Sequence, residues 1–398
     1  MRALLLEGIH PHAVTRLTAD GHDVEPVPRA LAEAELADRL RGVHLLGVRS
    51  KTQVTAAVLK AAEDLVAVGA FCVGTDQVDL AAASEGGVAV FNAPFSNTRS
   101  VVELALAEIV MLTRRIAEKN AAMHRGVWDK DATGSHEVRG QRLGIVGYGN
   151  IGAQLSVLAE GLGMRVSFYD TADKLALGNA QRCDSLEELL GAADVVTLHV
   201  DGRSGNSGFF GAAQFARMKP GSLFLNLSRG FVVDHAALRD SLVSGHLGGA
   251  AVDVFPEEPQ GRGDAFASTL RGLPNVILTP HIGGSTEEAQ ADIGGFVANK
   301  LAQYVREGNS TLSVNLPGVA MPERPGGHRI THLHTNTPGV LAQVNSILAA
   351  QAVNVEGQQL STRGPLGYLV TDVSAGIGPQ VLEELRAMPE TVRLRVLS

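Results

Sequence analysis

Three polar residues suited to proton and hydride chemistry follow apolar stretches in the middle of the chain. Arg229 lies in LFLNLSRG, Glu258 in AVDVFPEEP and His281 in VILTPHIGGS. A histidine ionises near neutral pH and can take a proton from a hydroxyl group, and a carboxylate on its other ring nitrogen would fix its tautomer. Arginine binds a carboxylate through two parallel hydrogen bonds. Each residue alone would suit a surface loop, but together they indicate redox chemistry on a small hydroxy acid.

A glycine-rich turn indicates a dinucleotide site upstream of these residues. Gly147, Gly149 and Gly152 lie between a predicted strand and a predicted helix, and Asp170 ends the next strand. Such glycines permit a tight turn and close approach of a pyrophosphate to the helix N-terminus, while the acid binds a ribose hydroxyl. The glycines alone would suit an ordinary turn, but the order of elements favours a cofactor. Because the segment after Asp170 (TADK) has no arginine for a 2′-phosphate, we expect NAD.

Short apolar runs alternate with helical stretches on both sides of residue 100, which predicts parallel sheets with helical crossovers. The expected strands of the first half are Ala3–Leu6, Leu45–Val48, Leu65–Val68 and Val88–Phe91, with helices at Ala30–Leu40 and Thr55–Ala62. Those of the second are Leu143–Val146, Val166–Tyr169, Val195–His199, Leu223–Leu227, Ala251–Val254 and Val276–Leu278. The predicted fold class is α/β with two doubly wound domains, one flavodoxin-like and one Rossmann.

The domain boundaries follow from these elements. Residues 1–97 and 284–316 are expected to form a discontinuous substrate-binding domain, with an NAD-binding domain at 98–283. A Pro/Gly-rich linker at 317–327 precedes a small domain at 328–398. Its strand-helix-strand, strand-helix-strand pattern predicts a ferredoxin-like α+β fold.

Net charge, hydropathy and cysteine content indicate which partners this protein is not expected to bind. A net charge of −8 disfavours nucleic acid and anionic membranes as partners, and no apolar run approaches the ~20 residues of a membrane span. The two cysteines, Cys72 and Cys183, are too few for a disulfide framework or a structural zinc site. We therefore expect a cytoplasmic protein with no metal, no membrane and no nucleic-acid partner.

The sequence resembles the D-isomer-specific 2-hydroxyacid dehydrogenases through GYGNIG, LNLSRG, DVFPEEP and TPHIGGS, in the order and spacing of that family. The resemblance covers nearly the whole chain. It implies an NAD-dependent enzyme in which His281, Glu258 and Arg229 take the catalytic places. The positions implied to contact NAD are Gly147, Gly149, Asn150, Ile151, Gly152, Asp170, Leu227, Ser228, Asp253, Gly283 and Gly284.

Within that family the chain is most similar to the bacterial branch that oxidises D-3-phosphoglycerate to 3-phosphohydroxypyruvate, the first step towards L-serine. The similarity lies in VRSKTQVT, FCVGTDQVDL, FNAPFSNTRSVVE and HRGVWDK. It implies a homo-oligomer, expected to be a tetramer. A phosphorylated substrate also needs local positive charge in an acidic protein. The residues expected to bind substrate are Arg49, Ser50, Lys51, Gly74, Asn97 and, from a neighbouring subunit, Lys130.

Residues 328–398 resemble an ACT domain, a small-ligand-binding module that usually pairs across subunits. In serine-inhibited relatives the positions of His334, Asn336 and Asn354 hold L-serine, which implies feedback inhibition. The residues Asn-Thr-Pro-Gly are also favoured in ordinary turns. The alternative that this domain pairs subunits without binding serine therefore stays open.

Other functions fit the same residues. Hydroxypyruvate or glyoxylate reduction and 4-phosphoerythronate oxidation would use the same trio, and reduction of 2-oxoglutarate to 2-hydroxyglutarate is expected as a side activity. An NAD-sensing binding protein is the alternative from another class. One departure from the family is Asp201, where a proline is common two residues after His199; it borders the expected adenine pocket and so bears on cofactor affinity.

Overall fold

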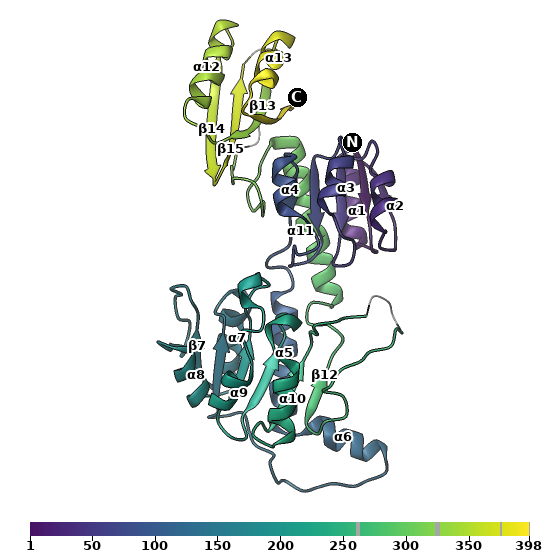
Figure 1. The fold of residues 1–398 in the computed structure, drawn as a ribbon, viewed down its shortest axis with the longest axis vertical. Coiled ribbons are helices and arrows are strands. Elements are labelled where there is room, and N and C mark those ends of the chain that lie inside the picture. Colours follow the sequence, from purple (N-terminus) through teal and green to yellow (C-terminus); the bar gives the residue numbers. More distant parts are fainter. Residues whose placement is uncertain (260–262, 323–326, 375, 398) are drawn as a thin grey trace. The chain divides into compact units, whose positions relative to one another are not determined.

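The computed structural model describes residues 1–259, 263–322, 327–374 and 376–397, and Figure 1 shows their fold. The chain divides into two compact units, Met1–Ser96 with Gln290–Ser398, and Asn97–Ala289. The first unit is therefore discontinuous, and it also contains the C-terminal sheet. The division into three domains with a linker at 317–327 stays a prediction, and residues 323–326 of that linker lie outside the described residues.

The first unit begins with a parallel five-stranded sheet in the order β2-β1-β3-β4-β5, the flavodoxin-like order. Its strands are β1 Arg2–Leu5, β2 Asp23–Pro26, β3 Leu45–Val48, β4 Ala67–Ala70 and β5 Ala89–Phe91. The helices between them are α1 Pro11–Ala19, α2 Glu33–Arg39, α3 Ala56–Ala61 and α4 Leu80–Glu85. Sequence patterns missed β2, α1 and α4; the strand β2 is largely exposed and has no apolar run.

A long helix that follows the second unit in the sequence completes the core of this sheet. Helix α11, Glu287–Glu307, packs its apolar side chains with those of α1 and of strands β1, β4 and β5. A side chain at Gly69 of β4 would collide with Val297 and Leu301 of α11. Glycine is thus required there because helix and strand lie in close contact. Helices α2, α3 and α4 cover the opposite face.

The second unit contains a parallel seven-stranded sheet in the order β12-β11-β10-β9-β6-β7-β8, a Rossmann order extended by one strand. Its strands are β6 Arg142–Val146, β7 Arg165–Tyr169, β8 Gln181–Arg182, β9 Val195–Leu198, β10 Leu223–Asn226, β11 Gly249–Val252 and β12 Val276–Leu278. The two-residue edge strand β8 was too short to predict. The fold class expected from the sequence is confirmed.

Helices cover both faces of this second sheet. On one face lie α5, Thr98–Thr113, and α7, Asn150–Gly161, and on the other α8, Leu186–Ala192, α9, Ala212–Arg217, and α10, His235–Val243. Helix α6, Ile116–His124, has no buried residue. The carboxyl ends of the strands therefore emerge at one edge between two helical layers.

The C-terminal segment forms a four-stranded antiparallel sheet in the order β14-β15-β13-β16. Its elements are β13 His328–Thr335, α12 Val340–Ala350, β14 Val355–Arg363, β15 Leu366–Val373, α13 Pro379–Ala387 and β16 Thr391–Leu397. The predicted ferredoxin-like order is confirmed. Among the described residues, no helix combines the length and apolar character that crossing a bilayer requires.

Candidate active site

The predicted histidine and glutamate meet in the second unit. Nδ1 of His281 lies 2.8 Å from Oε2 of Glu258. The bond to Glu258 raises the pKa of His281 and outweighs the opposing effect of burial. Partial burial opposes ionisation of Glu258, but hydrogen bonds from His281 and the Phe255 amide outweigh it, and the pKa of this carboxyl lies below its usual value. With Nδ1 directed at the carboxylate, Nε2 of His281 remains to exchange a proton.

Arg229 contributes a positive charge to this pair. It follows β10 and its Nη1 donates to the Ser228 carbonyl at 2.8 Å, while its charge lowers the pKa of both Glu258 and His281. The arginine, glutamate and histidine are thus brought into one electrostatic cluster, as predicted from their strand ends. An arginine here can bind a substrate carboxylate.

The turn that carries Arg229 is organised by a residue that sequence reasoning missed. The buried Asn226 side chain accepts hydrogen bonds from the Ser228 amide and hydroxyl and donates to the Arg229 carbonyl at 3.0 Å. Leu227 and Ser228, expected at the cofactor, are buried in the same turn. The signal was present in the sequence as one amide residue in an apolar strand.

Asp253 fixes the loop that presents His281. Its buried carboxylate accepts the backbone amides of Ile282 and Gly283, each at 2.8 Å, and the Thr279 hydroxyl at 2.6 Å. The His281 amide binds the Asp253 carbonyl at 2.8 Å. His281 itself has φ of 54°, the left-handed region that a residue with a side chain rarely adopts. This set of bonds holds the histidine in a strained conformation, a frequent property of functional sites.

The predicted glycine turn joins β6 to α7 and has the shape that a dinucleotide requires. Gly147 has φ of 93°, and a Cβ there would lie 2.5 Å from the His199 carbonyl oxygen. A Cβ at Gly152 would collide with the Gly147 carbonyl. In contrast, a Cβ at Gly149 meets nothing within 4 Å, so this glycine leaves open space beside the α7 N-terminus. Asn150 and Ile151 start that helix, whose unpaired amides suit a pyrophosphate.

Asp170 lies at the end of β7 and is anchored to the same turn. Its carboxylate accepts the Tyr148 amide at 2.8 Å and the Ala172 amide at 2.8 Å. The Tyr148 ring is buried and stacks on Phe168 at 3.7 Å between centroids. The glycines leave room for a pyrophosphate, and Asp170 is held at the strand end where it can bind a ribose hydroxyl. These residues therefore fit an NAD molecule.

Three further predicted positions, Gly283, Gly284 and Asn97, lie together where α5 begins. Gly283 is buried against Asp253, and a side chain at Gly284 would collide with Asn97. Asn97 is the N-cap residue of α5, yet its side chain makes no capping bond and its Oδ1 is buried without a hydrogen bond among the described residues. The Asn97 side chain therefore has an acceptor at the start of α5 that the described residues do not use.

The remaining predicted substrate residues lie in the first unit. Arg49, Ser50 and Lys51 follow β3, and the Glu7 carboxylate, at the end of the neighbouring β1, accepts the amides of Arg49 at 3.3 Å, Lys51 at 3.1 Å and Thr52 at 2.8 Å. The sequence analysis did not identify Glu7 as a residue that organises this loop. Gly74 lies in the loop after β4, and its carbonyl oxygen accepts a hydrogen bond from the Cys72 thiol.

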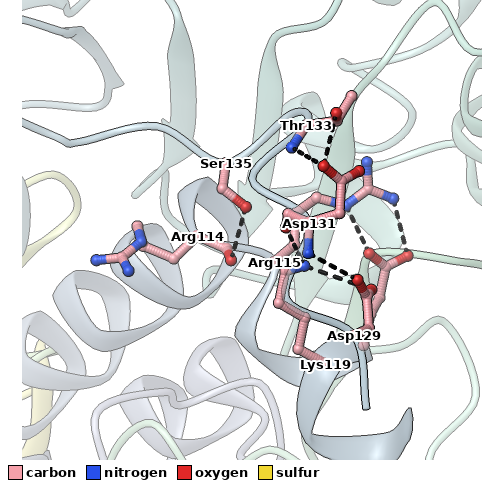
Figure 2. A network of polar contacts seen from close by, with 8 residues as sticks. Arg114, Arg115, Lys119, Asp129, Asp131, Thr133 and Ser135 are labelled. Carbon is pink, nitrogen blue, oxygen red and sulfur yellow. Dashed lines mark hydrogen bonds and ion pairs between the residues drawn. The ribbon is translucent and has the colours of Figure 1, made fainter. Parts of the chain in front are cut away.

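Lys130 is exposed in the loop after α6. The loop is organised by polar contacts (Figure 2): Lys119 binds Asp129 at 3.4 Å, and the Asp129 carboxylate accepts a hydrogen bond from the Asp131 amide at 3.0 Å. Arg115 is paired with Glu118 at 2.6 Å. These bonds hold the backbone on both sides of Lys130.

The predicted serine contacts of the C-terminal sheet differ in exposure. His334 is buried, its Nδ1 faces the Thr335 carbonyl at 2.9 Å, and its ring packs against Gly367. Asn336 is exposed and donates to the Gly364 carbonyl at 3.3 Å, and Asn354 is exposed. The two asparagines are therefore accessible to a ligand.

Asp201, the departure from the family pattern, binds Arg203 and the Asn206 side chain. The bond from Arg203 lowers the pKa of Asp201 despite partial burial. Burial lowers the pKa of the preceding His199 to about 4, so His199 is neutral near pH 7.

Residues 106–283 match the family described as D-isomer specific 2-hydroxyacid dehydrogenase, NAD binding domain. Residues 330–393 match the AHAS small subunit-like ACT domain. The D-3-phosphoglycerate dehydrogenase of Escherichia coli (strain K12) is 50% identical over 400 residues, which cover 100% of this chain and 97% of that protein.

Solved structures show the same fold. A protein of Thermus thermophilus has a TM-score of 0.69 and 33% identity, covering 76% of this chain and 96% of that one. The NAD-dependent formate dehydrogenase of Staphylococcus aureus, solved in complex with NAD, has a TM-score of 0.65 and 26% identity, covering 76% and 95%.

Proposed function

Since this chain belongs to the D-isomer-specific 2-hydroxyacid dehydrogenases, a family of NAD-dependent oxidoreductases, we propose that it oxidises D-3-phosphoglycerate to 3-phosphohydroxypyruvate. The observation that carries the chemistry is the 2.8 Å contact of His281 and Glu258 beside Arg229. The choice of substrate is supported by the E. coli relative of that name, which is similar over the full length.

Each residue of the trio has a distinct part in this proposal. Nε2 of His281 takes the hydroxyl proton of the substrate, and Glu258 stabilises the imidazolium that results. Arg229 binds the substrate carboxylate and thereby orients C2. The nicotinamide, when bound, accepts the hydride that leaves C2. Asn97, Arg49, Ser50, Lys51, Gly74 and the neighbouring subunit's Lys130 are proposed to bind the rest of the substrate.

The test follows NADH absorbance with purified protein and phosphohydroxypyruvate, in parallel with glyoxylate, hydroxypyruvate and 2-oxoglutarate. We expect the highest kcat/KM with phosphohydroxypyruvate and a slow side reaction with 2-oxoglutarate. A preference for an unphosphorylated acid would overturn the substrate. No turnover with any acid, in protein that binds NADH, would favour the NAD-sensing alternative.

The C-terminal ACT domain is compatible with allosteric regulation. We propose that L-serine binds there through His334, Asn336 and Asn354 and inhibits turnover. The exposed amides of Asn336 and Asn354 support this assignment. Loss of serine inhibition in Asn336→Ala or Asn354→Ala, with kcat retained, is the expected result. Wild-type protein that binds no serine would leave the domain with the role of pairing subunits.

A homotetramer in the cytoplasm, acting in serine biosynthesis, completes the proposal. Light scattering coupled to size-exclusion chromatography tests the assembly, since a tetramer of the 41.7 kDa chain has four times that mass.

A further inference from the structure

A buried carboxyl group that the proposed reaction does not use lies on α5, the helix that packs against the strands leading to Asp253 and Thr279. Glu108, on α5, is 1% exposed. Helix α5 packs against β11 and β12, the strands that Asp253 and Thr279 follow. The charge of Asp253 and the hydroxyl of Thr279 both act on the Glu108 carboxyl. Neither of its oxygens makes a hydrogen bond of normal geometry within the described part of the chain.

The direction of the hydrogen bonds determines which form of Glu108 suits this place. A threonine hydroxyl has one proton, and Thr279 donates it to Asp253 at 2.6 Å. Thr279 therefore presents lone pairs to Glu108, and these favour a protonated carboxyl over a carboxylate. Burial and the charge of Asp253 raise the pKa of Glu108 to about 8; Thr279 would lower it only by donating to Glu108 instead of Asp253.

We propose that Glu108 is a positioning residue for the oxidation, acting on His281 through Thr279 and Asp253, an inference that rests on the proposed function. While Glu108 is neutral, Asp253 is the one carboxylate in this buried group and holds the amides of Ile282 and Gly283. When Glu108 ionises, two like charges share the space and repel each other. The bonds that keep His281 in its strained conformation are then weakened, and turnover falls.

The charged groups around Glu108 are few. Strands β10, β11 and β12, which pack against α5, contain no ionisable residue. The neighbouring helices α6 and α7 contain Glu118, Lys119, His124 and Glu160, but the charge that acts on Glu108 is that of Asp253. The pH response assigned to this site therefore belongs to the pair Glu108 and Asp253.

The first arm of the test compares pH profiles of kcat for phosphoglycerate oxidation between pH 6.5 and 10. In the wild type we expect a rise through the pKa of His281 and a fall above about pH 8, reaching about tenfold at pH 9 if the ionised form is inactive. Glu108→Gln cannot ionise and should lack the falling limb. Glu103→Gln is the matched control, because Glu103 lies on the same helix but is exposed, and it should keep the wild-type profile.

The second arm needs no substrate. Hydrogen exchange of the peptide 279–285, corrected for the intrinsic rate, should show weaker protection at pH 9 than at pH 7 in the wild type and equal protection in Glu108→Gln. Equal protection at both pH values in the wild type, or a falling limb that persists in Glu108→Gln, would overturn the assignment. Absence of turnover in the wild type would instead defeat the proposed function, and the exchange arm would still decide the role of Glu108.

Discussion

Nδ1 of His281 is 2.8 Å from Oε2 of Glu258, and this contact raises the proton affinity of the ring. The carboxylate stabilises the charged imidazolium and thereby raises the pKa of His281. In the oxidation the ring must begin neutral, so activity rises with pH through that raised pKa. In the reduction the ring must begin protonated, so activity falls over the same range.

Replacement of the carboxylate should move this pH dependence. Glu258→Gln removes the negative charge, so the pKa of His281 falls and the rising limb of the oxidation shifts to lower pH, with a lower maximum kcat. Steady-state rates across pH 6–9 measure the shift. Glu257→Gln, at the exposed neighbouring residue, is the control and should keep the wild-type limb. An unshifted limb in Glu258→Gln would mean that another group titrates.

Loss of the histidine should abolish proton transfer without loss of the cofactor. We expect His281→Ala to lower kcat at least ~100-fold, the usual scale for a general base. NADH affinity, measured by fluorescence titration, should stay close to wild type. His124→Ala, at an exposed histidine of the same unit, should keep full activity. Unimpaired turnover in His281→Ala would refute its role as the base.

The two glycines of the cofactor turn should respond differently to the same substitution. At Gly147 a methyl group would collide with the His199 carbonyl in a backbone conformation that disfavours side chains, so Gly147→Ala should lower both the Tm and NAD affinity. At Gly149 the space is open, so Gly149→Ala should keep the wild-type Tm and lose NAD affinity alone. Thermal unfolding and calorimetric NAD titration separate the two effects. Equal NAD affinity in Gly149→Ala and wild type would place the pyrophosphate elsewhere.

Asp170 should account for the preference for NAD over NADP. Its carboxylate, held by two backbone amides, would bind the ribose hydroxyl of NAD and repel a 2′-phosphate. In Asp170→Ala the ratio of kcat/KM for NAD to that for NADP should fall about tenfold or more, since a charged hydrogen bond is lost and a repulsion is removed. Asp173→Ala, at an exposed acid nearby, should leave the ratio at its wild-type value. An unaltered ratio in Asp170→Ala would require another source of selectivity.

Local sequence patterns predicted the elements that carry strong signals. The buried strands of both parallel sheets have continuous apolar runs, and the glycine turn lies between a strand and a helix in the expected order. These two signals made the fold class predictable. The exposed edge strands β2 and β8 lack such runs. The meeting of Glu258 and His281 could be predicted because both follow adjacent parallel strands, β11 and β12.

Contacts that depend on three-dimensional packing could not be predicted. Glu103 and Glu108 both interrupt the same apolar helix pattern, but five residues place them on different faces, so one is exposed and the other buried. Glu7 acts by binding backbone amides of a loop, and no spacing rule identifies such a partner, whereas Asn226 at least stands out as one amide residue in an apolar strand. The left-handed conformation of His281 arises from the Asp253 contacts, which join residues that are about 30 positions apart.

The discontinuity of the first unit has a consequence for the order of events during synthesis. The five-stranded sheet receives one covering helix, α11, only after the 193 residues Asn97–Ala289 have been translated. At about 5–20 residues per second this delay is roughly 10–40 s. Over that interval the face of the nascent sheet that α11 will cover has α1 on it but lacks α11. The last residue of the cofactor-binding unit, Ala289, is translated before most of α11, so this unit has its full sequence before the first unit does.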